Sequence, residues 1–522
     1  METGHRKGVI QRYGLLLWCF LTAAAVLAVC SKSSFLYPFN DWVDANCYFT
    51  VGKGMMNGLV PYRDLMEQKG VLLYFLHGLA YLVSHTTFIG VYILEVVAGT
   101  AFLYYAAKTA ALFLDVRWGY VLAPVLAALV YASASFAHGD SAEEYCLPLL
   151  MFGFYALMRF FKDGEDLSRK MFIVCGALAG CVLWIKYTML GFWAGWVLAV
   201  FVGLLIAKQP RRAFTACGWF LLGMAAATLP WVIYFAVNGA LGGWFHAYFY
   251  LNFTAYPKTA GLLEMLSAAR NTVVETVAAS PTLMASAAVG MLGFVFTNKL
   301  LRGVWPKVCY VLLPVLLAVG VYAGGRTYPY YFLILLGMLL LPGLIAAAYA
   351  LSALARTAAP IRPAAARTGV RALRLLVSAM LCAATLVLST LGAYGSYQYR
   401  DFMQQDQEEL AQYRFAAIMN EEEAPTLLNY GFLDGGFYTA ADILPTVRYF
   451  CKLNLDLPEM TQVQQQAIRN KTVDFVVLRY RGGKQEYGGD VPYLLDNYEL
   501  VDTVQQNFEH MNFTYCLFQV KA

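Results

Sequence analysis

Residues 171–207 read MFIVCGALAGCVLWIKYTMLGFWAGWVLAVFVGLLIA, and Lys186 is the one charged residue in this stretch. A helix needs about 20 consecutive apolar residues to cross the hydrocarbon core of a membrane. The stretch is long enough for two such helices, at 171–188 and 190–207. It therefore predicts two membrane helices joined by a tight turn that contains a lysine.

The whole composition agrees with a membrane protein. Of the 522 residues, 60% are hydrophobic and 14% are charged, a balance that soluble cores of this size do not accommodate. This excludes a soluble enzyme and a disordered protein. The eleven cysteines are scattered, mostly inside apolar runs, which argues against a disulfide scaffold. The six histidines include no pair at helical ligand spacing, which argues against zinc.

Eleven apolar runs are predicted to cross the membrane. They are residues 13–31, 87–108, 118–136, 145–161, 171–188, 190–207, 214–236, 281–297, 307–322, 330–350 and 372–394. A further run at 70–84 is short and contains His77. We expect 70–84 to be a re-entrant or interfacial helix.

Positive charges set the expected orientation, because cytoplasmic loops are rich in Lys and Arg. If 70–84 does not cross, six basic segments share one side of the membrane. They are Arg6/Lys7/Arg12, Lys108/Arg117, Arg159/Lys162/Arg169/Lys170, Lys208/Arg211/Arg212, Lys299/Arg302/Lys307 and Arg356/Arg362/Arg367/Arg371/Arg374. The sequence thus predicts a multi-pass cell-membrane protein with a cytoplasmic N-terminus. A cleaved signal ending near Cys30 is the alternative, but Val29 stands where a lipoprotein box has a small residue.

The last part of the chain differs in charge. Residues 395–522 carry 18 Asp/Glu and 10 Lys/Arg, whereas residues 1–394 have a net charge of +13. Short apolar segments at Thr426–Tyr430, Val473–Arg479 and Phe513–Val520 alternate with polar stretches. We therefore expect a transmembrane domain at 1–394, with a first outer loop at 32–86, and a small extracytoplasmic α/β domain at 395–522.

The outer segments hold the polar residues that are hardest to explain. These candidate site residues are Asp41, Asp44, Lys69, Glu143, Glu144, Lys186 and Arg326. Each has a structural interpretation as well. An Asp of the first loop could cap a helix, and Lys69 could extend to the interface. Lys186 could extend to the interface or pair with Glu95, and Arg326 could form a loop salt bridge. An ionisable residue near the membrane nevertheless favours a functional role.

Carboxylates beside cations at the outer leaflet suit a substrate with an anionic head and a lipid tail, whose reaction needs a general base. A lipid-linked phosphosugar fits this description. Nucleotide sugars are absent outside the cell, so a transferase there needs a donor that carries its own leaving group, such as a polyprenyl phosphate. Lys and Arg would neutralise the departing phosphate.

At these residues the chain resembles the C-type (GT-C) integral-membrane glycosyltransferases, in the branch of protein mannosyltransferases and the lipid A aminoarabinose transferase. The order of Asp44, Tyr48, Met55, Gly58 and Pro61 is similar to the family's first outer loop. Three further features of the family have counterparts here. Lys69 stands before a short helix, Glu143 or Glu144 opens the segment after the second outer loop, and Lys186 ends a Gly-rich segment. Gly70 and Glu95 depart from the family pattern, which has Pro and often Arg.

The resemblance implies an α-helical polytopic fold and inverting transfer from a polyprenyl-phosphate sugar. It implies Asp44 as general base, with Asp41 as the fallback. Glu143 and Glu144 would position the acceptor, either by hydrogen bonds or through Mg²⁺ or Mn²⁺. From their charge, Lys69, Lys186 and Arg326 are also predicted to bind the donor phosphate. The acceptor is a glycan, a lipid or a protein, and no nucleic-acid partner is expected.

Two other classes of function are open. A transporter or flippase for a lipid-linked or anionic solute could use the same charges as a pathway, and an envelope scaffold could present the outer domain without catalysis. The acids cluster at the outer side, and no charged route reaches the cytoplasmic half. This distribution favours the enzyme.

Overall fold

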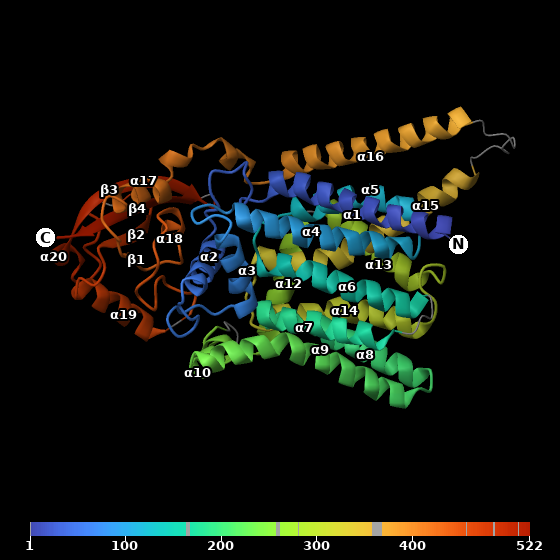
Figure 1. Ribbon diagram of the computed structural model, residues 1–522, viewed down its shortest axis with the longest axis horizontal. Helices are drawn as coiled ribbons and strands as arrows, with labels where there is room; N and C mark the ends of the chain where they lie inside the picture. The colour runs from blue at the N-terminus through green and yellow to red at the C-terminus, as the bar shows by residue number, and fades with distance from the viewer. Residues whose placement is uncertain are drawn as a thin grey trace. The chain divides into compact units, whose positions relative to one another are not determined.

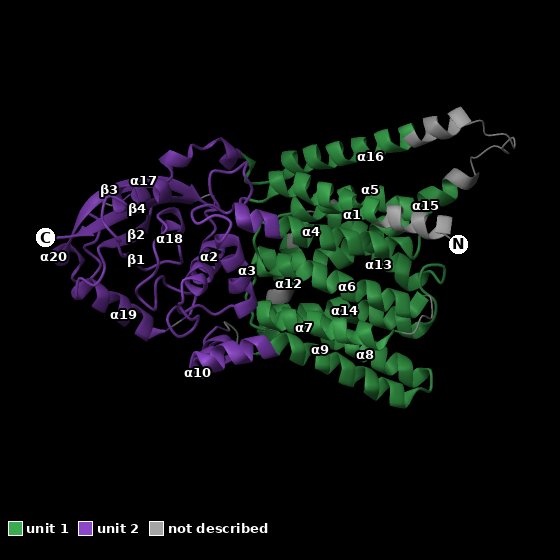
Figure 2. Ribbon diagram, viewed as in Figure 1, with its two compact units in different colours: residues 1–31, 95–228, 261–400 green, residues 32–94, 229–260, 401–522 purple. Residues whose placement is uncertain are grey.

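A computed structural model describes residues 2–162, 167–256, 261–279, 281–357, 368–455, 457–483, 486–509 and 511–521. Arg362 and Arg367 of the last basic segment lie outside these residues. The chain forms two compact units (Figure 2). Unit 1 comprises residues 1–31, 95–228 and 261–400, and unit 2 comprises residues 32–94, 229–260 and 401–522.

Unit 1 is a bundle of apolar helices (Figure 1). Its helices are α1 (Glu2–Cys30), α4 (Ile89–Ala111), η1 (Val116–Trp118), α5 (Gly119–Tyr131), α6 (Ala142–Lys162), α7 (Arg169–Lys186), η2 (Tyr187–Met189), α8 (Leu190–Ile206), α9 (Pro210–Val237), α12 (Leu262–Ala279), α13 (Pro281–Phe296), α14 (Val304–Tyr322), η4 (Pro329–Phe332), α15 (Leu333–Thr357) and α16 (Thr368–Ser396). Helices α4 and α9 extend into unit 2.

Each of the eleven predicted membrane runs contains a helix. Within the described residues, eight segments are long and apolar enough to cross a membrane, and one of them, Arg169–Ile206, contains both α7 and α8. The runs at 118–136 and 281–297 correspond to the shorter apolar helices Val116–Tyr131 and Leu283–Phe296. The polytopic helical fold is confirmed: nine of the eleven predicted runs lie in the eight long segments, and the other two correspond to the shorter helices.

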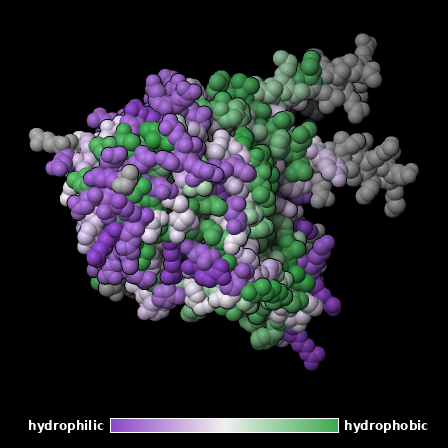
Figure 3. Space-filling model, turned by 60° about the vertical axis from the view of Figure 1, so that its left-hand side comes forward, coloured by the Kyte–Doolittle hydropathy of each residue, from purple (hydrophilic) through white to green (hydrophobic). Residues whose placement is uncertain are grey.

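The surface of unit 1 suits contact with lipid. In the most apolar stretch of α16 only 6% of the residues are buried within the structure, and in that of α9 only 17%. Large exposed apolar side chains such as Leu222, Leu388 and Leu391 lie on these helices. Figure 3 shows broad apolar areas on the face that it presents. Apolar surface of this extent marks a face that is covered in the native environment.

Four helical elements were missed in the sequence. Residues 237–280 lie between two predicted membrane runs and were expected to be a loop on the outer side, yet α10 (Leu241–Phe245), the π-helix η3 (His246–Tyr250), α11 (Leu251–Thr254) and α12 occupy this segment. Helix α12 contacts α13 and carries Glu264, Arg270 and Glu275. Its mixed polarity concealed it, because the search was for continuous apolar runs.

Unit 2 contains a four-stranded sheet and short helices. Its elements are α2 (Val43–Met56), α3 (Val71–Tyr81), α10, η3, α11, η5 (Arg400–Gln404), η6 (Gln407–Glu409), α17 (Ala411–Met419), β1 (Leu427–Asn429), α18 (Phe437–Ala440), α19 (Pro458–Arg469), β2 (Phe475–Arg481), α20 (Leu494–Asn497), β3 (Tyr498–Phe508) and β4 (Met511–Val520). The run at 70–84 forms α3, which has only 11 residues and is too short to cross a membrane as a straight helix.

The sheet confirms the predicted α/β character of the C-terminal residues. Its strand order is β1-β2-β4-β3, with β1 and β2 parallel and the other pairs antiparallel. The three predicted apolar segments became β1, β2 and β4. Strand β3 was missed because most of its side chains are polar and exposed on an edge strand. Helix α19 buries Met460, Ala467 and Ile468 at helical spacing, and the last two join the core beside Leu478.

Helix α2 packs within unit 2 against residues that follow β1. Thr50 Oγ1 donates a hydrogen bond of 2.6 Å to Asp434 Oδ2, and Lys53 Nζ donates one of 2.9 Å to the Tyr438 carbonyl. Gly436 has φ +89°, and a Cβ there would lie 2.5 Å from the Phe39 ring. The first outer loop thus groups with residues 401–522, whereas the sequence suggested a division at residue 394.

Candidate functional site

Asp44 lies in the first turn of α2, and its side chain is 14% exposed. The residue at the N-cap position is Trp42, whose side chain makes no capping hydrogen bond. Asp44, two residues further on, is therefore not the N-cap residue of α2. Its Oδ2 instead accepts a hydrogen bond of 3.2 Å from the hydroxyl of Tyr48, one turn along the same helix. The spacing of four residues places both side chains on one face of α2.

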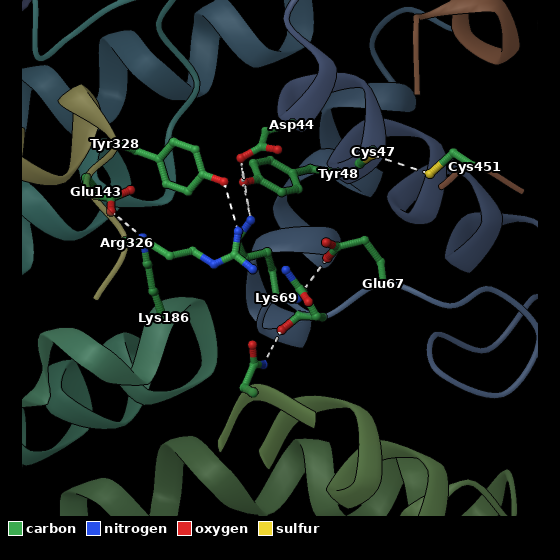
Figure 4. Close-up of polar contacts among 12 residues, drawn as sticks. Asp44, Cys47, Tyr48, Glu67, Lys69, Glu143, Lys186, Arg326, Tyr328 and Cys451 are labelled. Atoms are coloured by element: carbon green, nitrogen blue, oxygen red, sulfur yellow. Dashed lines mark hydrogen bonds and ion pairs between the residues drawn. The ribbon is translucent and has the colours of Figure 1, made fainter. Parts of the chain in front are cut away.

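Lys69 joins these two residues. Its Nζ lies 3.5 Å from Asp44 Oδ2 and donates a hydrogen bond of 3.0 Å to the Tyr48 hydroxyl (Figure 4). Burial is the largest single influence and lowers the pKa of Lys69, but Asp44 together with neighbouring groups such as Glu67 outweighs it and holds that pKa well above its usual value. Burial, assisted by Asp44, also raises the pKa of Tyr48 well above its usual value. Lys69 is thus a cation and Tyr48 a neutral hydrogen-bond donor.

The backbone around Lys69 is held from two sides. Glu67 Oε2 accepts a hydrogen bond of 2.8 Å from the Lys69 amide, and the Tyr74 hydroxyl donates to the same Glu67 oxygen. Asn252 Nδ2 donates a hydrogen bond of 2.7 Å to the Gln68 carbonyl. Because a fixed backbone limits the reach of the side chain, these contacts position the Lys69 ammonium beside Asp44.

Asp41, the second candidate base, has a different environment. Its Oδ1 accepts a hydrogen bond of 2.6 Å from Lys32 Nζ, and the two side chains are 2% and 3% exposed. A buried ion pair of this kind contributes little net stability, but removal of one partner leaves an uncompensated charge. Asp41 is therefore engaged by Lys32 in this arrangement.

In unit 1, Glu143 and Lys186 form a buried ion pair. Glu143 opens α6, Lys186 ends α7, and Lys186 Nζ donates a hydrogen bond to Glu143 Oε1 (Figure 4). The Lys186 ammonium also lies 3.8 Å from the centre of the Tyr331 ring. The expected alternative partner, Glu95, is not the residue that pairs with Lys186. The second oxygen of Glu143, Oε2, is buried and has no hydrogen-bond partner among the described residues.

Arg326 lies in the same unit, in the segment before η4. Its side chain is largely buried, and Nη1 donates a hydrogen bond of 3.2 Å to the Tyr328 hydroxyl. Tyr328 packs edge-on against Tyr331, the ring beneath the Lys186 ammonium. Glu143, Lys186 and Arg326 are thus linked through neighbouring tyrosines.

Glu144 belongs to another group, although it is adjacent to Glu143. Its Oε2 accepts a hydrogen bond of 2.9 Å from the Asp140 amide, and Glu95 Oε1 accepts from the same amide at 2.9 Å. Ser31 Oγ donates to both Glu95 oxygens. The structure therefore separates the two glutamates that the sequence had suggested as one unit.

The arrangement of the described residues bears on whether Glu143 and Glu144 could share a metal ion. No group of three or more His, Cys, Asp or Glu side chains within them is arranged to hold a metal ion. Glu143 is engaged by Lys186, and Glu144 turns toward Glu95 and Asp140. This arrangement does not fit a Mg²⁺ or Mn²⁺ ion shared by Glu143 and Glu144.

Sequence reasoning missed several residues of the site. Tyr48 entered the sequence analysis only as a motif residue, and Glu67, Tyr74 and Asn252 were not identified as partners of the Lys69 segment. The spacing of Asp44 and Tyr48 signalled their contact on one helix face. Nothing in the sequence indicated that residue 252 would lie against residue 68.

Solved structures with the same fold include ArnT from Cupriavidus metallidurans in two states. The structure bound to undecaprenyl phosphate has a TM-score of 0.58 and 12% identity, and covers 96% of this chain and 98% of that one. The apo structure has a TM-score of 0.60 and 12% identity, and covers 96% and 97%. The likeness confirms the expected fold, that of the C-type membrane glycosyltransferases.

The sequence comparisons point to a family. No curated protein matches the chain. The family model described as "Putative competence-induced protein Ccs4 N-terminal domain" matches residues 2–359, well over half of the 522 residues. The chain therefore belongs to the family of the putative competence-induced protein Ccs4, N-terminal domain.

Proposed function

We propose that the protein is a glycosyltransferase that moves a sugar from a polyprenyl-phosphate donor to an acceptor at the outer face of the membrane. The observation that carries this proposal is the contact of Asp44 with Tyr48 and Lys69. A partly exposed carboxylate lies within 3.5 Å of a cation, so one place offers a proton acceptor and a partner for a phosphate. The ArnT fold, and undecaprenyl phosphate in one ArnT structure, support a lipid-linked donor.

In the proposed reaction, Asp44 takes the proton of an acceptor hydroxyl. The hydroxyl oxygen attacks the anomeric carbon and forms the new glycosidic bond, while the bond from that carbon to the phosphate oxygen breaks. The polyprenyl phosphate leaves with the electron pair of the broken bond. Attack opposite the leaving group inverts the anomeric centre. A positioned base of this kind contributes about 10²–10⁴-fold to the rate.

Lys69 stabilises the negative charge that grows on the leaving phosphate. Its ammonium keeps its charge because Asp44 and neighbouring groups such as Glu67 together raise its pKa, and a charge held in a poorly hydrated place acts strongly on a transition state. Lys186 and Arg326 are further candidates for phosphate contact. Lys186 is neutralised by Glu143, so its contact with phosphate requires exchange of that partner. The Oε2 of Glu143, which has no hydrogen-bond partner in the described part of the chain, is suited to accept a hydrogen bond from a sugar or acceptor hydroxyl.

The proposed orientation follows from the basic segments. The connection between α8 and α9, which contains Lys208, Arg211 and Arg212, lies at one end of unit 1 (Figure 1). Its positive charges support a cytoplasmic location for that end. The chain then presents α2 and residues 401–522 to the outside, where the acceptor is a glycan, a lipid or a protein.

The test is transfer by purified protein from a radiolabelled polyprenyl-phosphate sugar to membrane extract. Asp44→Asn keeps the shape of the side chain but removes the proton acceptor, so turnover should fall by about 100-fold or more, while the variant still binds donor. Asp41→Asn is the matched control. It should lower thermal stability, because Lys32 loses its charged partner, and should leave the turnover of the folded protein close to the wild-type value.

Equal turnover of Asp44→Asn and the wild type would contradict the proposed base. Movement of intact donor across vesicle membranes without transfer of its sugar would favour the transporter.

A further inference from the structure

Two of the eleven cysteines form a close pair in unit 2. Cys47 lies on α2, Cys451 lies between α18 and α19, and their sulfur atoms are 3.8 Å apart (Figure 4). The two residues are 404 positions apart in the sequence, and both side chains are buried. Such a distance needs only a small movement to reach the roughly 2.05 Å of a covalent S–S bond.

The surroundings of the pair distinguish it from the other cysteines. Eight cysteines belong to unit 1, and the third of unit 2, Cys516, lies on β4 in the core of the sheet. Only Cys47 and Cys451 join the first outer loop to the C-terminal residues. In the proposed orientation, unit 2 faces the oxidising side of the membrane, where disulfides form and persist.

We propose that Cys47 and Cys451 form a disulfide bond that ties α2 to the segment after α18. Each thiol loses its proton, and the pair gives two electrons to the disulfide of a thiol oxidase or of a small-molecule disulfide. The oxidant leaves as two thiols, and the new S–S bond remains in the protein. The bond goes beyond the proposed transfer reaction and depends only on the proposed orientation.

Burial decides when the bond can form and break. It raises the pKa of the Cys47 thiol well above its usual value, and raises that of Cys451 as well. Only the thiolate exchanges with disulfides, so exchange is slow once the unit has closed around the pair. The bond therefore forms while the unit is still open, and in the folded protein it resists a reductant.

The position of the bond gives it a role in the site. Cys47 is three residues after Asp44 and directly before Tyr48. The non-covalent contacts of Thr50 and Lys53 with the segment 434–442 lie further along the same helix. A covalent tie at Cys47 therefore fixes the first half of α2, which carries the proposed base.

The test uses the full-length protein, alkylated with N-ethylmaleimide during cell lysis and then unfolded without reductant. Peptide mass spectrometry should find the peptides of Cys47 and Cys451 linked, with a mass two hydrogens below their sum, and should find them separate after reduction. Unfolded samples treated with a polymer-linked maleimide should gain two labels only after reduction. Cys47→Ala and Cys451→Ala should remove this gain, while the matched variant Cys516→Ala, also buried in unit 2, should keep it.

The same samples report on stability. The wild type should unfold at a higher temperature than Cys47→Ala, and the difference should shrink when the wild type is unfolded, reduced and refolded with reductant. Alkylated Cys47 and Cys451 in the unreduced wild type would overturn the proposal, whatever the transfer assay gives. A linked peptide in a protein without transferase activity would support the bond and reject the enzyme.

Discussion

Lys186 is a buried charged residue whose neighbours compensate its charge. It interrupts an apolar stretch at the end of α7, and its charge is matched by Glu143 and by the face of Tyr331. A buried ion pair contributes little net stability, but the loss of one partner leaves a charge without compensation. The pair therefore fixes how the ends of α6 and α7 meet.

Removal of one partner of this pair should lower the stability of the protein much more than removal of both. Lys186→Gln should destabilise the protein by about 3–5 kcal/mol, because Glu143 keeps a buried charge without a partner. The double variant Lys186→Met with Glu143→Leu should recover most of that loss. The measurement is thermal unfolding in detergent, with donor binding recorded in parallel.

If the double variant is as unstable as the single one, the pair is not the source of the effect. If Lys186→Gln binds donor as the wild type does, Lys186 has no part in phosphate binding.

The polar residues were predictable as a set, but their partners were not. The sequence indicated that Asp44, Lys69, Glu143 and Lys186 needed an explanation, because charges near a membrane are costly. It did not reveal that Glu143 and the adjacent Glu144 would take different partners. Adjacent residues on a helix point in directions about 100° apart, and only the neighbouring helices determine what each one meets.

At the scale of elements, the packing of α2 within unit 2 involves one buried carboxylate, that of Asp434. Asp434 accepts hydrogen bonds from Thr50 Oγ1 at 2.6 Å and from the Gly436 amide at 2.9 Å. Burial nevertheless raises the pKa of Asp434 from its ordinary 3.8 to about 6. Between about pH 4 and pH 6, Asp434 therefore keeps its proton in the folded unit, whereas it has lost that proton in the unfolded chain.

This predicts that the stability of unit 2 falls as the pH rises from about 4 to about 6. The folded pKa is the higher one, so the stabilisation is complete below the unfolded pKa and is lost as the pH passes the folded pKa. The size is on the order of 3 kcal/mol, because each pH unit between the unfolded and folded pKa values corresponds to about 1.4 kcal/mol. Asp434→Asn stays uncharged and should lack this component.

The measurement is thermal unfolding of wild type and Asp434→Asn at matched pH values, and the difference between the two proteins isolates this group. A difference that does not change between pH 4 and pH 6 would contradict the prediction.

The sequence predicted some elements well and others poorly, for physical reasons. Long apolar runs have few alternatives to a helix in a membrane protein, and every predicted run contains an apolar helix. Strand β3 and helix α12 escaped detection because each carries polar side chains on much of its surface. Strand β3 is placed by its pairing with β4, the strand that follows it in the chain, and α12 contacts α14 and η4 as well as the adjacent α13.

At the scale of the whole molecule, the orientation is open to direct test. Gln209 lies in the exposed connection between α8 and α9, and Glu421 is exposed after α17. Single cysteines at these positions should react oppositely with a membrane-impermeant maleimide in intact cells. Position 421 should be labelled, and position 209 should be labelled only after the membrane is opened.

The parent protein, with its own mostly buried cysteines, gives the background. Labelling of 209 but not 421 in intact cells would invert the proposed topology and remove the outer site.

Unit 2 is discontinuous, and this has a consequence for biosynthesis. Residues 32–94 leave the ribosome long before residues 401–522, and the roughly 300 residues between them take on the order of 15–60 s to translate. During that interval Thr50 and Lys53 are without the partners they find in segment 434–442. A nascent chain that stalls before residue 434 therefore exports a first loop with unpaired polar groups, which quality-control proteases can recognise as immature.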